Sequence, residues 1–203
     1  MDTVGGVILV GGQARRMGGG DKCLKLLGGQ TLLSRIIGRV QPQISIMILN
    51  ANGNTERFLD YKLTTVSDVI GDFAGPLAGI LTGMEWMRTH HPGVKWLASI
   101  PGDAPFIPRD FVGKCLKAAS RTGTDIICAK SSGQAHPVCA LWKVKLADEL
   151  RWAMERDGIR KIDKWSSNYL VHHEEFPTDP IDPFFNINSE EDLLLAETMD
   201  HNI

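Results

Sequence analysis

The chain has 203 residues, which is enough for one domain with a substantial hydrophobic core. Hydrophobic residues make up 43% and charged residues 23%, as in an ordinary globular protein. The net charge of −2 at pH 7 argues against a nucleic-acid or membrane surface, and no apolar run reaches membrane-spanning length. The four cysteines form no C-x-x-C pair, so we expect reduced, unlinked thiols in a cytoplasmic protein.

Short apolar runs predict β-strands along the chain. The first run, Val7 to Val10, leads directly into a glycine-rich loop. The predicted strands are residues 7–10, 44–49, 63–67, 96–100, 125–129, 138–142 and 169–174.

Helical segments alternate with these strands. Thr31 and Ser189 are predicted N-caps, and Pro76 and Pro108 are predicted to open their helices. The predicted helices are residues 31–40, 55–60, 108–120, 145–157 and 159–166, with further helices beginning at Pro76 and after Ser189.

This alternation predicts an α/β protein with a mostly parallel sheet covered on both faces, formed as a single domain by residues 1–203. We expect the strand near Val138 to join out of order or antiparallel. Ligands of open α/β sheets bind at the carboxyl ends of the strands. The glycine-rich loop, Asn50, Asp68 and Asp103 each follow a predicted strand, so we expect them at one edge of the sheet.

The glycine-rich loop has the composition of a phosphate-binding loop. Residues 11–22 contain five glycines and three cations, Arg15, Arg16 and Lys22, and a fourth cation, Lys25, follows. Backbone N–H groups and cationic side chains together favour a polyphosphate over a solvated turn. Neither the Walker A pattern nor the dinucleotide fingerprint G-x-G-x-x-G occurs.

Several polar residues near predicted strand ends are candidate ligands. Asp103 follows a buried strand between two prolines, and its carboxylate could hold Mg²⁺ or bond its own turn. Asn50 and Asp68 could bind a base or ribose, although each alone favours a turn role. The amides of Asn186 and Asn188 alternate with apolar residues, so they point to one side and could cap the sheet or line a site. His136, at a strand start, is more often structural in such a position.

Taken together, these motifs resemble the signature of nucleotidyltransferases, in the molybdenum cofactor guanylyltransferase (MobA) branch. The resemblance covers nearly the whole chain in motif order, with Val10 where the family usually has alanine. The matching segments are Leu9-Val10-Gly11-Gly12 with Arg15, Arg16, Met17, Gly18, Gly19, Asp21 and Lys22; Asn50-Ala51-Asn52; Asp68; Gly75-Pro76-Leu77-Ala78-Gly79; Pro101-Gly102-Asp103-Ala104-Pro105; His136-Pro137; and Asn186-Ile187-Asn188.

The resemblance implies a Rossmann-like three-layer sandwich that uses GTP and Mg²⁺ to attach GMP to molybdopterin cofactor and releases pyrophosphate. It also implies molybdenum insertion proteins, and acceptor molybdoenzymes or their chaperones, as partners. By position, Lys22 with Arg16 would bind phosphates and Asp103 would bind magnesium. Asn186 and Asn188 would face the pterin or the metal. The implied nucleotide contacts are Leu9, Val10, Gly11, Gly12, Asn50 and Asp68.

Three alternatives remain open at the level of sequence. A cytidylyl enzyme would use CTP, although Gly75-Pro76-Leu77-Ala78-Gly79 and the Gly-Gly of the first loop favour the guanylyl branch. A non-catalytic module could carry or insert the cofactor, but Lys22 and Asp103 argue against it. An NAD-dependent oxidoreductase is a distant third, because the dinucleotide fingerprint is missing.

Overall fold

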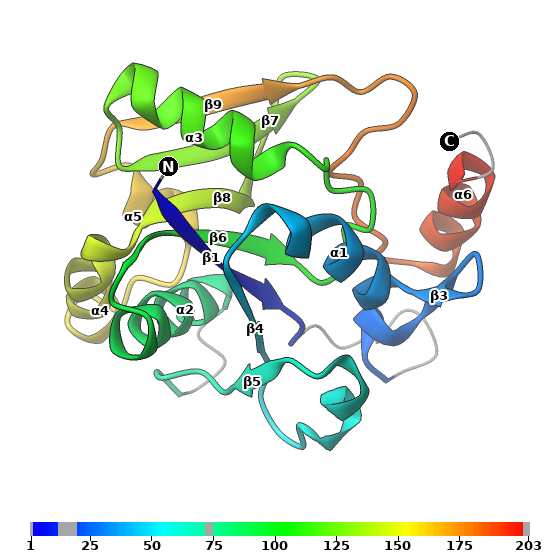
Figure 1. Cartoon of the computed structure of the whole chain (residues 1–203), viewed down its shortest axis with the longest axis horizontal. Helices are drawn as coiled ribbons and strands as arrows, with labels where there is room; N and C mark the ends of the chain where they lie inside the picture. The colour runs from blue at the N-terminus through cyan, green and yellow to red at the C-terminus, as the bar shows by residue number, and fades with distance from the viewer. Residues whose placement is uncertain (1, 12–19, 72–74, 201–203) are drawn as a thin grey trace.

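The apolar runs form one mixed β-sheet in the computed structural model, which describes residues 2–11, 20–71 and 75–200 (Figure 1). Seven strands of these residues lie in the order β5-β4-β1-β6-β8-β7-β9. β8 runs antiparallel to both of its neighbours, as the sequence predicted, and the other pairings are parallel. The strands are β1 (Thr3–Leu9), β4 (Ile46–Asn50), β5 (Thr64–Val66), β6 (Val94–Pro101), β7 (Ile126–Ser131), β8 (Gln134–Lys143) and β9 (Val171–Phe176).

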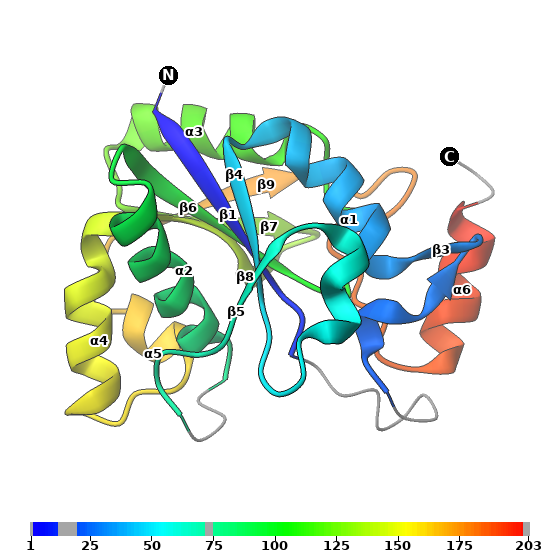
Figure 2. The same ribbon diagram turned by 60° about the horizontal axis from the view of Figure 1, so that its bottom comes forward.

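Helices cover both faces of the sheet, so the predicted three-layer α/β fold is confirmed (Figure 2). α1 (Leu32–Val40) and α3 (Phe111–Thr122) lie on one face. The other face is covered by α2 (Pro76–His90), α4 (Ala147–Glu155) and α5 (Ile162–Ser166). None of the helices in the described ranges is both long and apolar enough to cross a bilayer.

The core follows the alternation of side chains along the central strands. In β1, Val4 and Ile8 pack toward α1 and α3, whereas Val7 packs toward α2. All three side chains are almost inaccessible to solvent. This burial on both faces explains why the central strands have continuous apolar sequences.

A third small core lies outside the sheet. α6 (Glu190–Asp200) packs beside a short hairpin, β2 (Leu26–Leu27) and β3 (Gln30–Thr31), that the sequence did not predict (Figure 1). Ile187 is fully buried in this cluster. The C-terminal segment is thereby held against the region that follows the glycine-rich loop.

Several predicted boundaries are wrong. The helix predicted from Pro108 begins at Phe111, because the Pro108 carbonyl accepts a turn hydrogen bond from the Phe111 N–H. α4 and α5 begin later than predicted, at Ala147 and Ile162, and β9 runs over residues 171–176 where 169–174 were predicted. The segment predicted as helix 55–60 is a 3₁₀ helix, η3 (Glu56–Tyr61). Further 3₁₀ turns are η1 (Lys22–Leu24), η2 (Gln41–Gln43) and η4 (Val144–Leu146).

Candidate functional site

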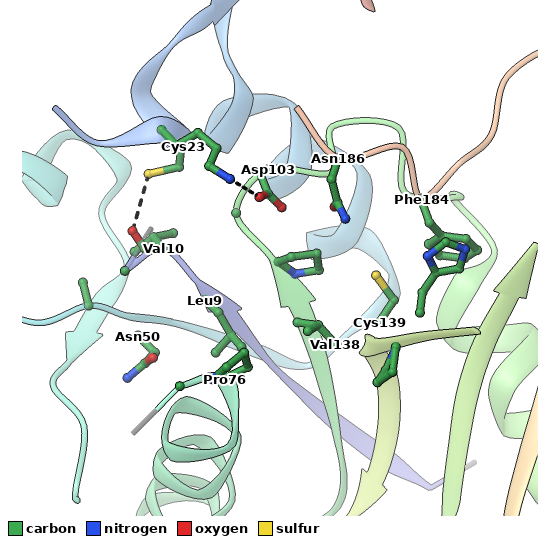
Figure 3. A pocket seen from close by; sticks show the side chains of 18 of the residues that line it. Leu9, Val10, Cys23, Asn50, Pro76, Asp103, Val138, Cys139, Phe184 and Asn186 are labelled. Carbon is green, nitrogen blue, oxygen red and sulfur yellow. Dashed lines mark hydrogen bonds and ion pairs between the residues drawn. The ribbon is translucent and has the colours of Figure 1, made fainter. Parts of the chain in front are cut away.

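A pocket of about 510 Å³ opens at the carboxyl edge of the sheet. In Figure 3, Leu9 and Asn50 lie on one side of Asp103. Cys139 and Phe184 lie on the other side. The predicted site residues that line this pocket are Leu9, Val10, Gly11, Lys22, Asn50, Asp68, Asp103 and Asn186.

Two predicted residues, Gly12 and Arg16, lie outside the described residues. Asn188 does not line the pocket, but its Oδ1 accepts a hydrogen bond from Lys22 Nζ at 2.8 Å. The structure therefore brings nine predicted site residues to one edge, although they come from remote parts of the chain.

Lys22 lies at the centre of this edge. Its Nζ is 2.6 Å from Asp103 Oδ2, and the two side chains are only 16% and 20% exposed. Such partial shielding makes the attraction between a cation and a carboxylate stronger than at an open surface. Lys22, Asp103 and Asn188 thus form a preassembled polar cluster beside the pocket.

The backbone holds Asp103 in place. Its carbonyl accepts a hydrogen bond from the Ile187 N–H at 2.9 Å, and the neighbouring Gly102 N–H donates to the Leu9 carbonyl at 2.9 Å. A Cβ on Gly102 would lie only 2.9 Å from that carbonyl oxygen. Glycine at position 102 therefore lets the loop after β6 approach the end of β1 closely.

The Asn186–Asn188 segment alternates as predicted. Ile187 is buried between the two amides, whose residues are both exposed. Asp192 Oδ2 accepts from the N–H groups of Asn188 and Ser189, and Ser189 Oγ accepts from the Asp192 N–H. This reciprocal pair is a capping box. The cap leaves the Asn188 side chain for Lys22.

Asn50 and Asp68 belong to one hydrogen-bonded group at the other end of the pocket. Asn50 Nδ2 donates to Asp68 Oδ1 at 2.8 Å, and Asn52 Nδ2 donates to Asp68 Oδ2 at 2.7 Å. β4 and β5 pair with Asn50 opposite Val66, which brings the residues after both strands together. Asn52 also lines the pocket and was not among the predicted site residues.

The remaining wall comes from β8 and was largely missed. Cys128 pairs with Ala140, but the next residue, Ala129, pairs with His136. Residues 137–139 therefore have no partner on β7 and form a large bulge. Bulges re-aim side chains and occur beside active sites, and residues 134–139 all line the pocket. The available sequence signal was Pro137, since proline inside a strand favours a bulge.

The thiols in the pocket are protonated at neutral pH. Burial raises the pKa of Cys23 to about 12, and burial also raises the pKa of Cys139 well above its ordinary value. All four cysteines are free and buried. Thiolate chemistry therefore does not fit this site.

His136 has the opposite shift. Burial lowers its pKa, while Asp182 and Glu175 act in the upward direction. Its ring packs against Phe184 with the centroids 4.8 Å apart. The histidine is accordingly neutral at pH 7, and it lies on the β8 wall.

The arrangement suits charged ligands that are positioned by polar groups. A cation and a carboxylate at the carboxyl edge of an α/β sheet can bind a polyphosphate and a divalent cation. Among the described residues, no group of three or more His, Cys, Asp or Glu side chains could hold a metal. Asp103 is the carboxylate that directly accompanies Lys22.

Two solved structures share the fold of this chain. Molybdopterin-guanine dinucleotide biosynthesis protein A from Archaeoglobus fulgidus superposes with a TM-score of 0.75 at 23% identity, covering 98% of this chain and 100% of its own. A CMP:2-keto-3-deoxy-manno-octonic acid synthetase complexed with CTP superposes with a TM-score of 0.76 at 9% identity, covering 99% and 100%. Both superpositions cover nearly the whole chain, so they establish the shared mixed α/β fold.

Comparisons of the sequence define the class of protein, which is a nucleotidyltransferase. A model of the MobA-like NTP transferase domain matches residues 6–173. Molybdenum cofactor guanylyltransferase from Nitrobacter hamburgensis is 48% identical over 194 residues, covering 96% of this chain and 93% of its own. The chain belongs to the MobA-like NTP transferase family.

Proposed function

We infer that this protein is a molybdenum cofactor guanylyltransferase, which transfers GMP from GTP to molybdopterin cofactor and releases pyrophosphate. The observation that carries this inference is the 48% identity, over nearly the whole chain, to a protein of that name. The pocket supports it, because a cation, a carboxylate and several amides converge where an α/β sheet binds nucleotides. We further propose that residues 1–203 act as one domain.

In this proposal the site has a nucleotide side and a centre where the phosphates react. The ends of β1 and β4 form the nucleotide side, where Leu9, Val10, Gly11, Asn50 and Asp68 line the pocket. Through the family resemblance alone, Gly12 joins this side, and Arg16 joins Lys22 at the phosphates. The nucleotide side would hold the guanosine and direct its phosphates toward the centre of the edge.

Lys22 and Asp103 occupy that centre. Lys22 Nζ would bind the phosphates, and Asn188 Oδ1, at 2.8 Å, would fix the direction of its ammonium group. The acceptor in this reaction is a phosphate that is already ionised at neutral pH. The transfer therefore requires positioning and charge neutralisation and no strong general base.

Asp103 fits a magnesium site that has few protein ligands. Its Oδ2 binds Lys22, but Oδ1 receives no hydrogen bond from any described residue, so one carboxylate oxygen remains available. Magnesium in nucleotide enzymes is held by one or two carboxylates together with substrate phosphates and water. Bound there, Mg²⁺ would neutralise charge that develops on the leaving pyrophosphate.

The decisive experiment offers the protein molybdopterin cofactor, Mg²⁺ and one nucleoside triphosphate at a time, and identifies the product by mass spectrometry. Formation of the guanine dinucleotide form from GTP supports the proposal. Preferential use of CTP would make the protein a cytidylyltransferase. Tight cofactor binding without pyrophosphate release would favour a carrier or insertion role.

Molybdenum insertion proteins, and molybdoenzymes or their chaperones, are the proposed partners of the active enzyme.

A further inference from the structure

A hydrogen-bonded chain of three side chains lies behind the β8 wall of the pocket. Ser131 Oγ donates to Asp182 Oδ1 at 2.9 Å, and the same Oγ lies 2.7 Å from His136 Nε2. Ser131 is 1% exposed, so these bonds are shielded from water. The residues come from β7, from β8 and from the segment that precedes Asn186.

This chain selects one tautomer of His136. The Ser131 hydroxyl has a single proton, and an ionised carboxylate can only accept. With that proton directed to Asp182, the Ser131 oxygen must accept from His136 Nε2–H. In the neutral ring Nδ1 then keeps its lone pair, and no described residue hydrogen-bonds to it.

The ring is also fixed in orientation. Phe184 packs against its face, and the Phe184 N–H donates to the same Asp182 Oδ1 at 3.0 Å. Asp182 therefore holds both the serine and the aromatic support. His136 presents a rigid hydrogen-bond acceptor on a wall whose other groups include the apolar Pro137 and Val138.

The β8 wall is a different part of the pocket from the proposed nucleotide side. Asn50 is the last residue of β4, whereas His136 lies on β8, and β1 and β6 stand between these strands. Two whole strands of the sheet thus separate the β8 wall from the proposed nucleotide side. Asp103, after β6, lies between them (Figure 3).

We propose that His136 Nδ1 accepts a hydrogen bond from an N–H group of the acceptor heterocycle, and that Ser131 and Asp182 are positioning residues which fix the tautomer of His136. The proposal rests on the proposed function, since it assigns the β8 wall to the pterin of molybdopterin. Apolar surface from Pro137, Val138 and Phe184 suits the face of a flat ring, while His136 accepts a hydrogen bond from an N–H group at the edge of that ring.

The test separates the two nitrogens of the ring. Glutamine at position 136 can replace Nε2 in the bond to Ser131 but offers no acceptor at the δ position. Asparagine places an amide oxygen near the position of Nδ1. We expect His136→Gln to raise the dissociation constant of molybdopterin roughly 3- to 10-fold, the value of one neutral hydrogen bond, and His136→Asn to recover part of that loss.

Ser131→Ala is compared with Ser132→Ala. The neighbouring Ser132 takes no part in the hydrogen bonds among Ser131, His136 and Asp182, and its Oγ donates to Thr178 Oγ1. The first should weaken molybdopterin binding and change the ¹⁵N NMR signature of the His136 ring from the Nε2–H tautomer. The second should change neither. Asp182→Asn keeps an Oδ1 acceptor and should retain most of the affinity, whereas Asp182→Ala should not.

Molybdopterin binding is measured directly by fluorescence, and GTP binding by calorimetry, so the result does not depend on turnover. A shift in GTP affinity alone, equal effects of Ser131→Ala and Ser132→Ala, or unchanged molybdopterin affinity in His136→Gln would each overturn the proposal. If wild-type protein transfers no nucleotide, the proposed function fails, while the binding measurements still decide the role of His136. Wild-type transfer with an unaffected His136→Gln variant defeats this inference alone.

Discussion

Helix α2 passes so close to the end of β4 that a Cβ on Gly79 would overlap Oδ1 of Asn50. The same Cβ would lie 2.6 Å from Leu9 Cδ2. Asn50 is 7% exposed and donates to Asp68, so it has little room to move. Glycine at position 79 therefore maintains the geometry of the proposed nucleotide side, in addition to packing the helix on the sheet.

We expect Gly79→Ala to weaken GTP binding because the added methyl displaces Asn50 from Asp68. Loss of that one hydrogen bond should raise the KM for GTP roughly 3- to 10-fold. Gly38→Ala is the matched control, since Gly38 lies in α1 and its Cβ would meet no heavy atom within 4 Å. The control should be stabilised by about 0.5–1 kcal/mol through helix propensity, with an unchanged KM. If the Gly79→Ala variant keeps the wild-type KM for GTP, Asn50 does not contribute to nucleotide binding.

Asp103→Ala should abolish transfer while the fold persists. Asp103 lies in a loop at the pocket, and its backbone bonds do not depend on the carboxylate. Loss of the proposed magnesium ligand should lower kcat on the order of 100-fold or more, the range for removing one key electrostatic group. Asp110→Ala is the control, because Asp110 is an exposed turn aspartate paired with Lys114. Circular dichroism establishes folding, and near wild-type turnover at saturating Mg²⁺ would reject the metal assignment.

The sequence predicted the shared edge well because that prediction needs only local information. Each strand end carries its polar residue directly after an apolar run, so Asn50, Asp68 and Asp103 could be assigned to one edge before any contact was known. The start of α3 could not be predicted in this way. The Val112 N–H donates to Gln43 Oε1, and Gln43 Nε2 donates to the Pro108 carbonyl. A capping partner 69 residues away leaves no local pattern.

The β8 wall was missed for a related reason. Pro137 indicates a bulge, but the length of the bulge depends on where β7 and β6 each stop pairing. Ser99 Oγ donates to the Val138 carbonyl at 2.6 Å and holds the bulge from the neighbouring strand. Pairing between distant strands therefore decides which side chains reach the pocket, and single-sequence patterns do not contain that information.

Lys22→Ala should impair the chemical step more than the choice of base. Lys22 Nζ pairs with Asp103, and its ammonium group suits phosphate oxygens and not an uncharged base. We expect kcat/KM to fall on the order of 100-fold while the ratio of GTP to ATP use stays constant. Lys25→Ala, which removes a neighbouring cation, serves as the control. If the preference for GTP collapses and turnover stays normal, Lys22 contacts the base.

The capping box of α6 should make its stability depend on pH. The Asn188 N–H, with smaller contributions from Ser189 and Lys22, lowers the pKa of Asp192 from its ordinary value of 3.8. A depressed pKa in the folded state means that the stabilisation is fully present above about pH 4 and is lost as the pH falls through the folded value. Asp192→Asn should therefore cost about 0.3–1 kcal/mol at pH 7.

Melting temperatures across a pH series check this expectation. The variant should melt about 1–4 °C below wild type at pH 7, and the two curves should converge in strong acid. Glu191→Gln, in the same helical turn, removes a charge but leaves the capping hydrogen bonds of Asp192 in place, and it should have a smaller effect. Parallel curves at every pH would show that ionised Asp192 contributes nothing.

The two asparagines beside this cap should have separable roles. Asn188 Oδ1 accepts a hydrogen bond from Lys22 Nζ, whereas Asn186 lines the pocket and makes no hydrogen bond to Lys22. Asn188→Ala should therefore lower kcat, because the lysine loses one of its two described partners, and should change KM little. Asn186→Ala should raise the KM for molybdopterin and leave the KM for GTP nearly unchanged. The neutral hydrogen bond expected from Asn186 corresponds to about 0.5–1.5 kcal/mol, or roughly 3- to 10-fold.

Steady-state kinetics with each substrate varied in turn distinguishes these outcomes, after each variant is shown to melt like wild type. Because Asp192 and Ser189 already satisfy the backbone, neither alanine should unfold α6. If Asn186→Ala raises the KM for GTP selectively, the segment belongs to the nucleotide side. If both variants lower thermal stability and change no kinetic constant, the amides serve the fold alone. The expected split, with kcat affected at position 188 and the molybdopterin KM at position 186, would place the boundary between the reacting phosphates and the pterin within this three-residue segment.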